Sequence, residues 1–109
     1  TELQIHQRQA QADKTRLDLE SALHNLLIQM DELVDVMELN RQEIESAQRK
    51  TEEELRLYEQ GRSDLTIVIQ SRDNQQNARQ ILAHNAASYH RLLLRYRELT
   101  DQLLDIREQ

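Results

Sequence analysis

The chain has 109 residues with 14 basic and 20 acidic side chains, which gives a formal net charge of −6 at pH 7. This length fits one structural unit, and the acidic balance argues against nucleic acid as a partner, because phosphate binding needs a concentrated basic face. Hydrophobic residues make up 38% and charged residues 31%, but three tyrosines are the only aromatic residues. That composition excludes a large aromatic core and is typical of long helices that share a narrow apolar seam.

Cysteine is absent, so disulfides and thiol chemistry are excluded. No apolar run is longer than three residues, and we therefore expect no membrane-spanning helix. The chain does not begin with a signal-peptide pattern either. If the parent protein is exported, we expect this chain to be a piece of it.

The first predicted element is a helix over residues 2–59. Apolar residues recur there in two rows with a seven-residue repeat, offset by three or four positions, which is the signature of a coiled-coil seam. The first row is Leu23, Met30, Met37, Ile44, Thr51 and Tyr58, and the second is Ile5, Ala12, Leu19, Leu26, Leu33, Asn40 and Ala47.

A turn is predicted over residues 60–64. Gly61 is the only glycine in a chain without proline, so it marks the place where the backbone is expected to reverse. Either Ser63 or Asp64 can cap the helix that follows. The run Thr66–Ile69 is β-branched throughout, which disfavours a helix start, but no second strand-like run exists to pair with it. We therefore expect it to be helical.

The second predicted helix covers residues 65–108 and repeats the two-row pattern. Its rows are Val68, Gln75, Leu82, Tyr89, Tyr96 and Leu103, and then Ser71, Ala78, Asn85, Leu92, Leu99 and Ile106. The fold class is therefore all-α, a long antiparallel two-helix coiled-coil hairpin in which residues 1–109 form a single domain.

Two registers remain open for this hairpin. One places Leu33 opposite Tyr89, and the other, shifted by about one helical turn, places Asn40 opposite Asn85. The two asparagines either fix the register at some cost in stability or stay solvated in a thin part of the seam.

One seam does not account for all the apolar residues. Those off the rows are Leu27, Ile28, Val34, Val36, Leu39, Ile81, Ala83, Ala86, Leu93 and Leu94. Leaving such side chains in water forgoes about 1.5–3 kcal/mol for each large one that could be buried. We therefore expect another helical neighbour and an oligomer.

An ordered set of residues around the turn resembles a known family. The set is Tyr58-x-x-Gly61, Ser63, Leu65, Val68-Ile69, Ala78, Leu82, Ala86, Tyr89 and Leu93. It is similar to the outer-membrane efflux protein (TolC-like) family, in which a Tyr-x-x-Gly turn separates two long helices. The resemblance covers about residues 55–99, while the first arm agrees only in length and seam.

The resemblance implies a hairpin of the periplasmic α-helical tunnel of a Gram-negative outer-membrane channel, in a tripartite efflux or type I secretion system. The intact protein would be a homotrimer, attached to the membrane only through parts absent from this chain. Its turn would dock the periplasmic adaptor (membrane fusion) protein. The docking tip carried over by position is Gly61, Arg62, Ser63, Asp64 and Leu65, and Tyr58 becomes a candidate gating contact with a neighbouring hairpin.

The chain also departs from the family pattern. Ser63 stands where the best-known members carry a basic gating residue, and Ile67 and Gln70 stand where they carry entrance carboxylates. An ionic latch is therefore not carried over, and closure would depend on Tyr58 and apolar packing. Whether the cargo is drugs, metal ions or polypeptides is left open by the sequence.

Chemical functions have little support in the sequence. His6, His24, His84 and His90 share no helical face, so no metal site is expected, and no catalytic residues or cofactor are expected on helical rods that offer no pocket. The run Glu52–Glu54 is interpreted as a solvated face with i,i+4 ion pairs to nearby Arg49, Lys50 and Arg56.

Two other functions remain open beside the channel hairpin. One is the α-hairpin of the periplasmic adaptor itself, since Arg62, Leu65 and Ser71 approach its turn pattern with different spacing. The other is an unrelated coiled-coil oligomerisation segment, for which the turn residues would be incidental.

Overall fold

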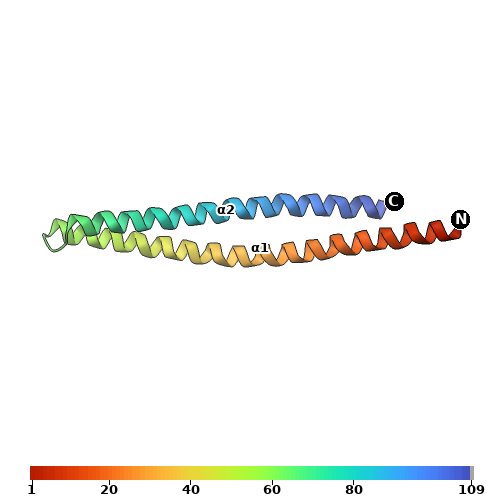
Figure 1. Cartoon of the computed structure of the whole chain (residues 1–109). Coiled ribbons are helices and arrows are strands. Elements are labelled where there is room, and N and C mark those ends of the chain that lie inside the picture. Colours follow the sequence, from red (N-terminus) through yellow and green to blue (C-terminus); the bar gives the residue numbers. More distant parts are fainter. Residues whose placement is uncertain (109) are drawn as a thin grey trace. The chain divides into compact units, whose positions relative to one another are not determined.

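A computed structural model describes residues 1–108 of the chain and contains two α-helices. Helix α1 spans Glu2–Glu59 and helix α2 spans Leu65–Glu108, joined by a short turn (Figure 1). No strand occurs in this described part. The predicted fold class, an all-α antiparallel helical hairpin, is confirmed.

Contacts between backbone positions divide the chain into two compact units. The first contains Thr1–Glu32 together with the described residues from His90 onward, and the second is Leu33–Tyr89. Each unit therefore contains one stretch of α1 and one of α2. The second unit also contains the turn, so it is a complete hairpin by itself.

The buried side chains lie on the predicted heptad rows in both units. Those of the first unit are Leu26, Met30 and Leu99, and those of the second are Met37, Asn40, Thr51, Val68 and Ser71. Every one of these eight positions belongs to an a or d row, so the seam read from the sequence is the seam of the structure. The buried hydroxyl of Thr51 donates to the carbonyl of Ala47 at 2.9 Å, which satisfies it within its own helix.

The register of the second unit is defined by an amide pair. The Nδ2 of Asn85 donates to the Oδ1 of Asn40 at 2.7 Å, and Asn40 is buried. This bond supports the shifted register, the one that places Asn40 opposite Asn85. A register that separated them would leave a buried amide without a partner, which is costly.

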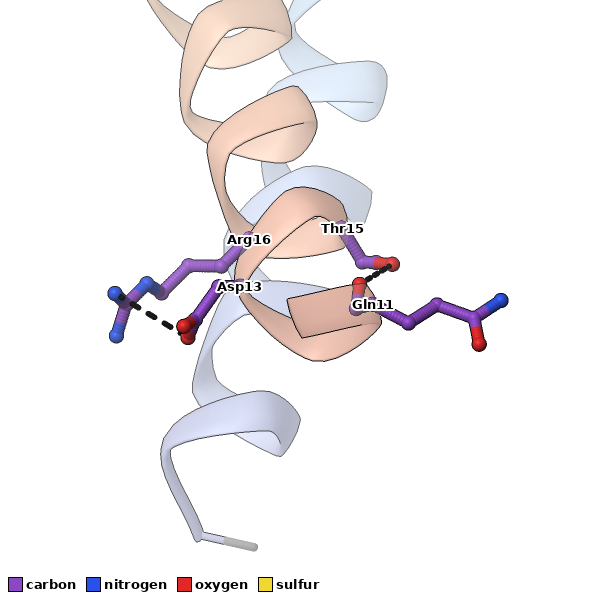
Figure 2. Close-up of polar contacts among 4 residues, drawn as sticks. All are labelled: Gln11, Asp13, Thr15 and Arg16. Atoms are coloured by element: carbon purple, nitrogen blue, oxygen red, sulfur yellow. Dashed lines mark hydrogen bonds and ion pairs between the residues drawn. The ribbon is translucent and has the colours of Figure 1, made fainter. Parts of the chain in front are cut away.

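Polar contacts on the surface of the first unit are local. Figure 2 shows Asp13 and Arg16 next to each other on α1, with Oδ1 and Nη2 3.8 Å apart, and both side chains are exposed. The hydroxyl of Thr15 donates to the carbonyl of Gln11 at 3.0 Å. Exposed pairs of this kind contribute little to stability, so the unit depends on its apolar seam.

The large apolar side chains off the rows are largely in contact with solvent. Exposed fractions between 42% and 57% are found for Leu27, Ile28, Val34, Val36, Leu39, Ile81 and Leu94. Leu93 is half-buried. A single copy of the chain thus leaves these faces available to a neighbour.

Candidate functional site

The turn that joins the helices begins with a capped end of α1. The N–H of Arg62 donates to the carbonyl of Leu57 at 2.8 Å, and the N–H of Gly61 donates to that of Tyr58 at 2.9 Å. Gly61 has a φ of 72°. These two hydrogen bonds and the left-handed residue define a Schellman motif, which satisfies carbonyls at a helix C-terminus.

Gly61 is needed for its backbone angle and not for lack of space. No atom lies within 4 Å of the place where a β-carbon would stand. A left-handed backbone is nevertheless strained for residues with a side chain. Gly61 therefore supplies a left-handed backbone at the place where the sequence predicts that the chain reverses.

The start of α2 is capped by Asp64. Its carbonyl accepts the N–H groups of Ile67 and Val68 at 3.1 and 3.3 Å, and its Oδ1 accepts the N–H of Thr66 at 3.4 Å. Of the two candidates, Ser63 and Asp64, the N-cap is therefore Asp64. The β-branched start of α2 forms a helix because this cap precedes it and because Val68, 3% exposed, is packed into the seam.

Ser63 has a different partner, one that the sequence did not suggest. Its hydroxyl donates to Oε2 of Glu54 at 2.9 Å, and both residues are half-buried. The bond ties the turn back onto α1 nine positions earlier. No helical spacing connects residues 54 and 63, so only the three-dimensional course of the turn reveals it.

The acidic run that contains Glu54 differs from the prediction. Glu52 accepts a hydrogen bond from Nε2 of Gln48 at 3.3 Å, and within residues 1–108 no ion pair joins the run to Arg49, Lys50 or Arg56. The prediction of i,i+4 ion pairs for this run is therefore wrong. Gln48 and the Ser63 hydroxyl hydrogen-bond to Glu52 and Glu54 instead, while Glu52 and Glu53 are exposed, as predicted for a solvated face.

The structure gathers the predicted docking residues in one short segment. Gly61, Arg62 and Asp64 are exposed, and Leu65, the first residue of α2, is 49% exposed. Tyr58 is 40% exposed although it continues an a row. The segment thus presents an apolar side chain, an aromatic ring and both signs of charge on a backbone that is hydrogen-bonded on each side of Gly61.

The described part of the chain holds neither a candidate metal site nor a membrane-spanning helix. Among residues 1–108, no three His, Cys, Asp or Glu side chains lie where they could share a metal ion. Neither helix, over the same residues, contains a stretch that is both long and apolar enough to cross a bilayer. Comparison of the chain with models of protein families, with curated proteins and with solved structures finds no match.

Proposed function

We propose that this hairpin is a periplasmic tunnel element of an outer-membrane channel in a tripartite efflux or type I secretion system, with no catalytic role. Its turn docks the hairpin tip of the periplasmic adaptor protein. The observation that carries the proposal is the Schellman turn at Gly61, which presents an exposed, internally hydrogen-bonded surface between two long helices. The family resemblance around Tyr58-x-x-Gly61 supplies the identity of the partner.

The exposed turn has features that suit a partner helix tip. Open space around Gly61 allows a partner side chain to approach the backbone. Leu65 offers an exposed apolar contact, and Arg62 and Asp64 offer opposite charges on each side of Ser63. A rigid surface of this kind loses little conformational entropy on binding.

Tyr58 is the proposed gating residue. Its carbonyl is fixed by the N–H of Gly61, while its ring is 40% exposed. A ring held at a fixed backbone position can close against a neighbouring hairpin of the proposed trimer. The exposed apolar side chains off the seam rows are consistent with such neighbours.

A binding experiment tests the docking role. The purified chain is titrated against isolated adaptor α-hairpins drawn from drug-efflux, metal-efflux and type I secretion systems, by calorimetry. We expect binding to at least one class, and loss of that binding in Gly61→Asn, because Asn adopts the left-handed backbone but fills the space beside it. The control Ser46→Asn adds the same amide at an exposed position of α1 and should bind normally.

A parallel titration against isolated trimeric outer-membrane channels separates the alternatives. Binding to a trimeric channel but to no adaptor hairpin would indicate that the chain is itself an adaptor hairpin. Binding to neither would favour an oligomerisation segment. Normal adaptor binding by Gly61→Asn, with unchanged helicity, would contradict docking at the turn.

A further inference from the structure

A charged groove runs along one face of the second unit. Its walls include Gln48 and Glu52 from α1 and Arg72 and Arg79 from α2. The two arginines are seven residues apart, so they lie on the same face of α2, and both are exposed. Within residues 1–108 neither guanidinium takes part in an ion pair.

The α1 side of this face carries an acidic row. Glutamates recur every seven residues at Glu38, Glu45, Glu52 and Glu59, and all four are exposed. Because Glu52 lines the groove, the heptad repeat places the others along the same side of the hairpin. Glu38 pairs within α1 with Arg41 at 3.5 Å, so the carboxylates of this row that no ion pair within the described residues engages are Glu45, Glu52 and Glu59, along the helix opposite the two arginines of α2.

The glutamates of α1 and the arginines of α2 lie at matching positions along the helix axes. Arg79 lies six residues before Asn85. Because the helices are antiparallel, the Asn40–Asn85 bond places Arg79 level with residue 46 of α1, next to Glu45. By the same register, Arg72 is level with the position after Glu52. Within one copy, however, Glu52 is bonded to Gln48 and no ion pair crosses the groove.

Exposed apolar residues continue the same face. Leu65 lies one heptad before Arg72, and Val34 lies two heptads before Gln48, which lines the groove. Ile69 likewise lies one heptad before the groove residue Gln76. The exposed fractions of Val34, Leu65 and Ile69 are 44%, 49% and 52%.

We propose that this face binds a second copy of the chain, related by a two-fold axis parallel to the helices. That symmetry lays α1 of one copy along α2 of the other, with the two turns at the same end. Arg72 then meets Glu52 of the second copy and Arg79 meets its Glu45, and the symmetry repeats both pairs. Ile69, which lies farther along α2 from the turn than Leu65, is covered in the same step, while Leu65 stays with the turn.

Charge also selects the orientation. If the turns pointed in opposite directions, α1 would lie on α1 and α2 on α2. Glutamates of one copy would then face glutamates of the other, and arginines would face arginines. Facing like charges are unfavourable. This pairing concerns the sides of the second unit and does not depend on adaptor docking at the turn.

Sedimentation equilibrium of the purified chain tests the pairing. We expect a monomer–dimer equilibrium that weakens as salt is raised, because the paired charges are partly exposed. The variant R72E/R79E should raise the dissociation constant on the order of 100-fold or more, because four attractive pairs become four repulsive ones. A wild-type chain that stays monomeric at about 1 mM overturns the proposal.

A matched variant and a mixing experiment provide the controls. Arg49 and Arg56 are also exposed and seven residues apart, but they lie on the edge of α1 turned away from the seam, so R49E/R56E should dimerise like wild type. The reciprocal variant E45R/E52R should be monomeric alone and should form a heterodimer with R72E/R79E. Equal loss in R49E/R56E, or failure of the two variants to combine, overturns the proposal. Circular dichroism checks that each variant is folded.

Cross-linking tests the orientation. The chain contains no cysteine, so a Gln60→Cys variant reports only on the turn. With both turns at one end, a short bismaleimide should link two copies, and the R72E/R79E background should abolish the link. A dimer that does not cross-link through residue 60 overturns the proposed arrangement.

Discussion

Gly61 determines the turn through one backbone angle. Its φ of 72° lets the N–H groups of Gly61 and Arg62 reach back to the last carbonyls of α1. Nothing packs against the position of its missing β-carbon. The cost of a substitution is therefore conformational, and it should differ between residues that tolerate the left-handed region and residues that do not.

Replacing Gly61 with alanine should lower the free energy of unfolding by about 1 kcal/mol, because an L-residue is strained at this angle. Gly61→Asn should cost less, because asparagine is the commonest alternative to glycine at this cap position. Urea unfolding followed by circular dichroism measures both. Equal stability of the alanine variant and wild type would mean that the turn adopts another conformation.

Within the helices, the Asn40–Asn85 hydrogen bond joins α1 to α2 and defines the register of the second unit. The 2.7 Å hydrogen bond from Nδ2 of Asn85 to Oδ1 of Asn40 lies inside the seam and forms in only one alignment of the helices. Leucines in both places would add apolar contact but would fit several alignments. The pair therefore exchanges some stability for a defined register.

Single and double substitutions separate these two effects. Asn40→Leu alone should destabilise the second unit by about 1 kcal/mol, because it leaves the half-buried amide of Asn85 without its hydrogen-bond acceptor. The double variant N40L/N85L should recover that loss. Its free energy of unfolding, measured in urea, should exceed that of wild type. Its register should become heterogeneous, seen as additional amide resonances by NMR. A double variant less stable than either single one would contradict this account.

Much of this element structure is contained in the sequence. Every buried position lies on a predicted heptad row, because burial in a two-helix seam follows the seven-residue repeat directly. The register was not determined, because Leu33 opposite Tyr89 and Asn40 opposite Asn85 are both acceptable seams, and only the observed amide bond distinguishes them. The Ser63–Glu54 bond was missed because its spacing belongs to the turn and not to a helix.

At the scale of the whole chain, the two units differ in how their helices are connected. In the second unit, α1 and α2 are joined directly by the turn. In the first unit, the paired stretches are separated in sequence by the entire second unit. Closing a longer loop costs more conformational entropy. We therefore expect the first unit to open more readily.

Leu99→Ala tests this expectation. Leu99 is 2% exposed and is the most deeply buried large side chain described, so its truncation should cost about 2–4 kcal/mol. Hydrogen–deuterium exchange should then speed up in residues 1–32 and 90–108, while residues 33–89 keep their protection, because local opening does not require the second unit to unfold. The matched variant Leu94→Ala, at a side chain 50% exposed on the same helix, should leave exchange nearly unchanged. Uniform loss of protection through residues 33–89 in Leu99→Ala would show instead that the two units unfold as one cooperative structure.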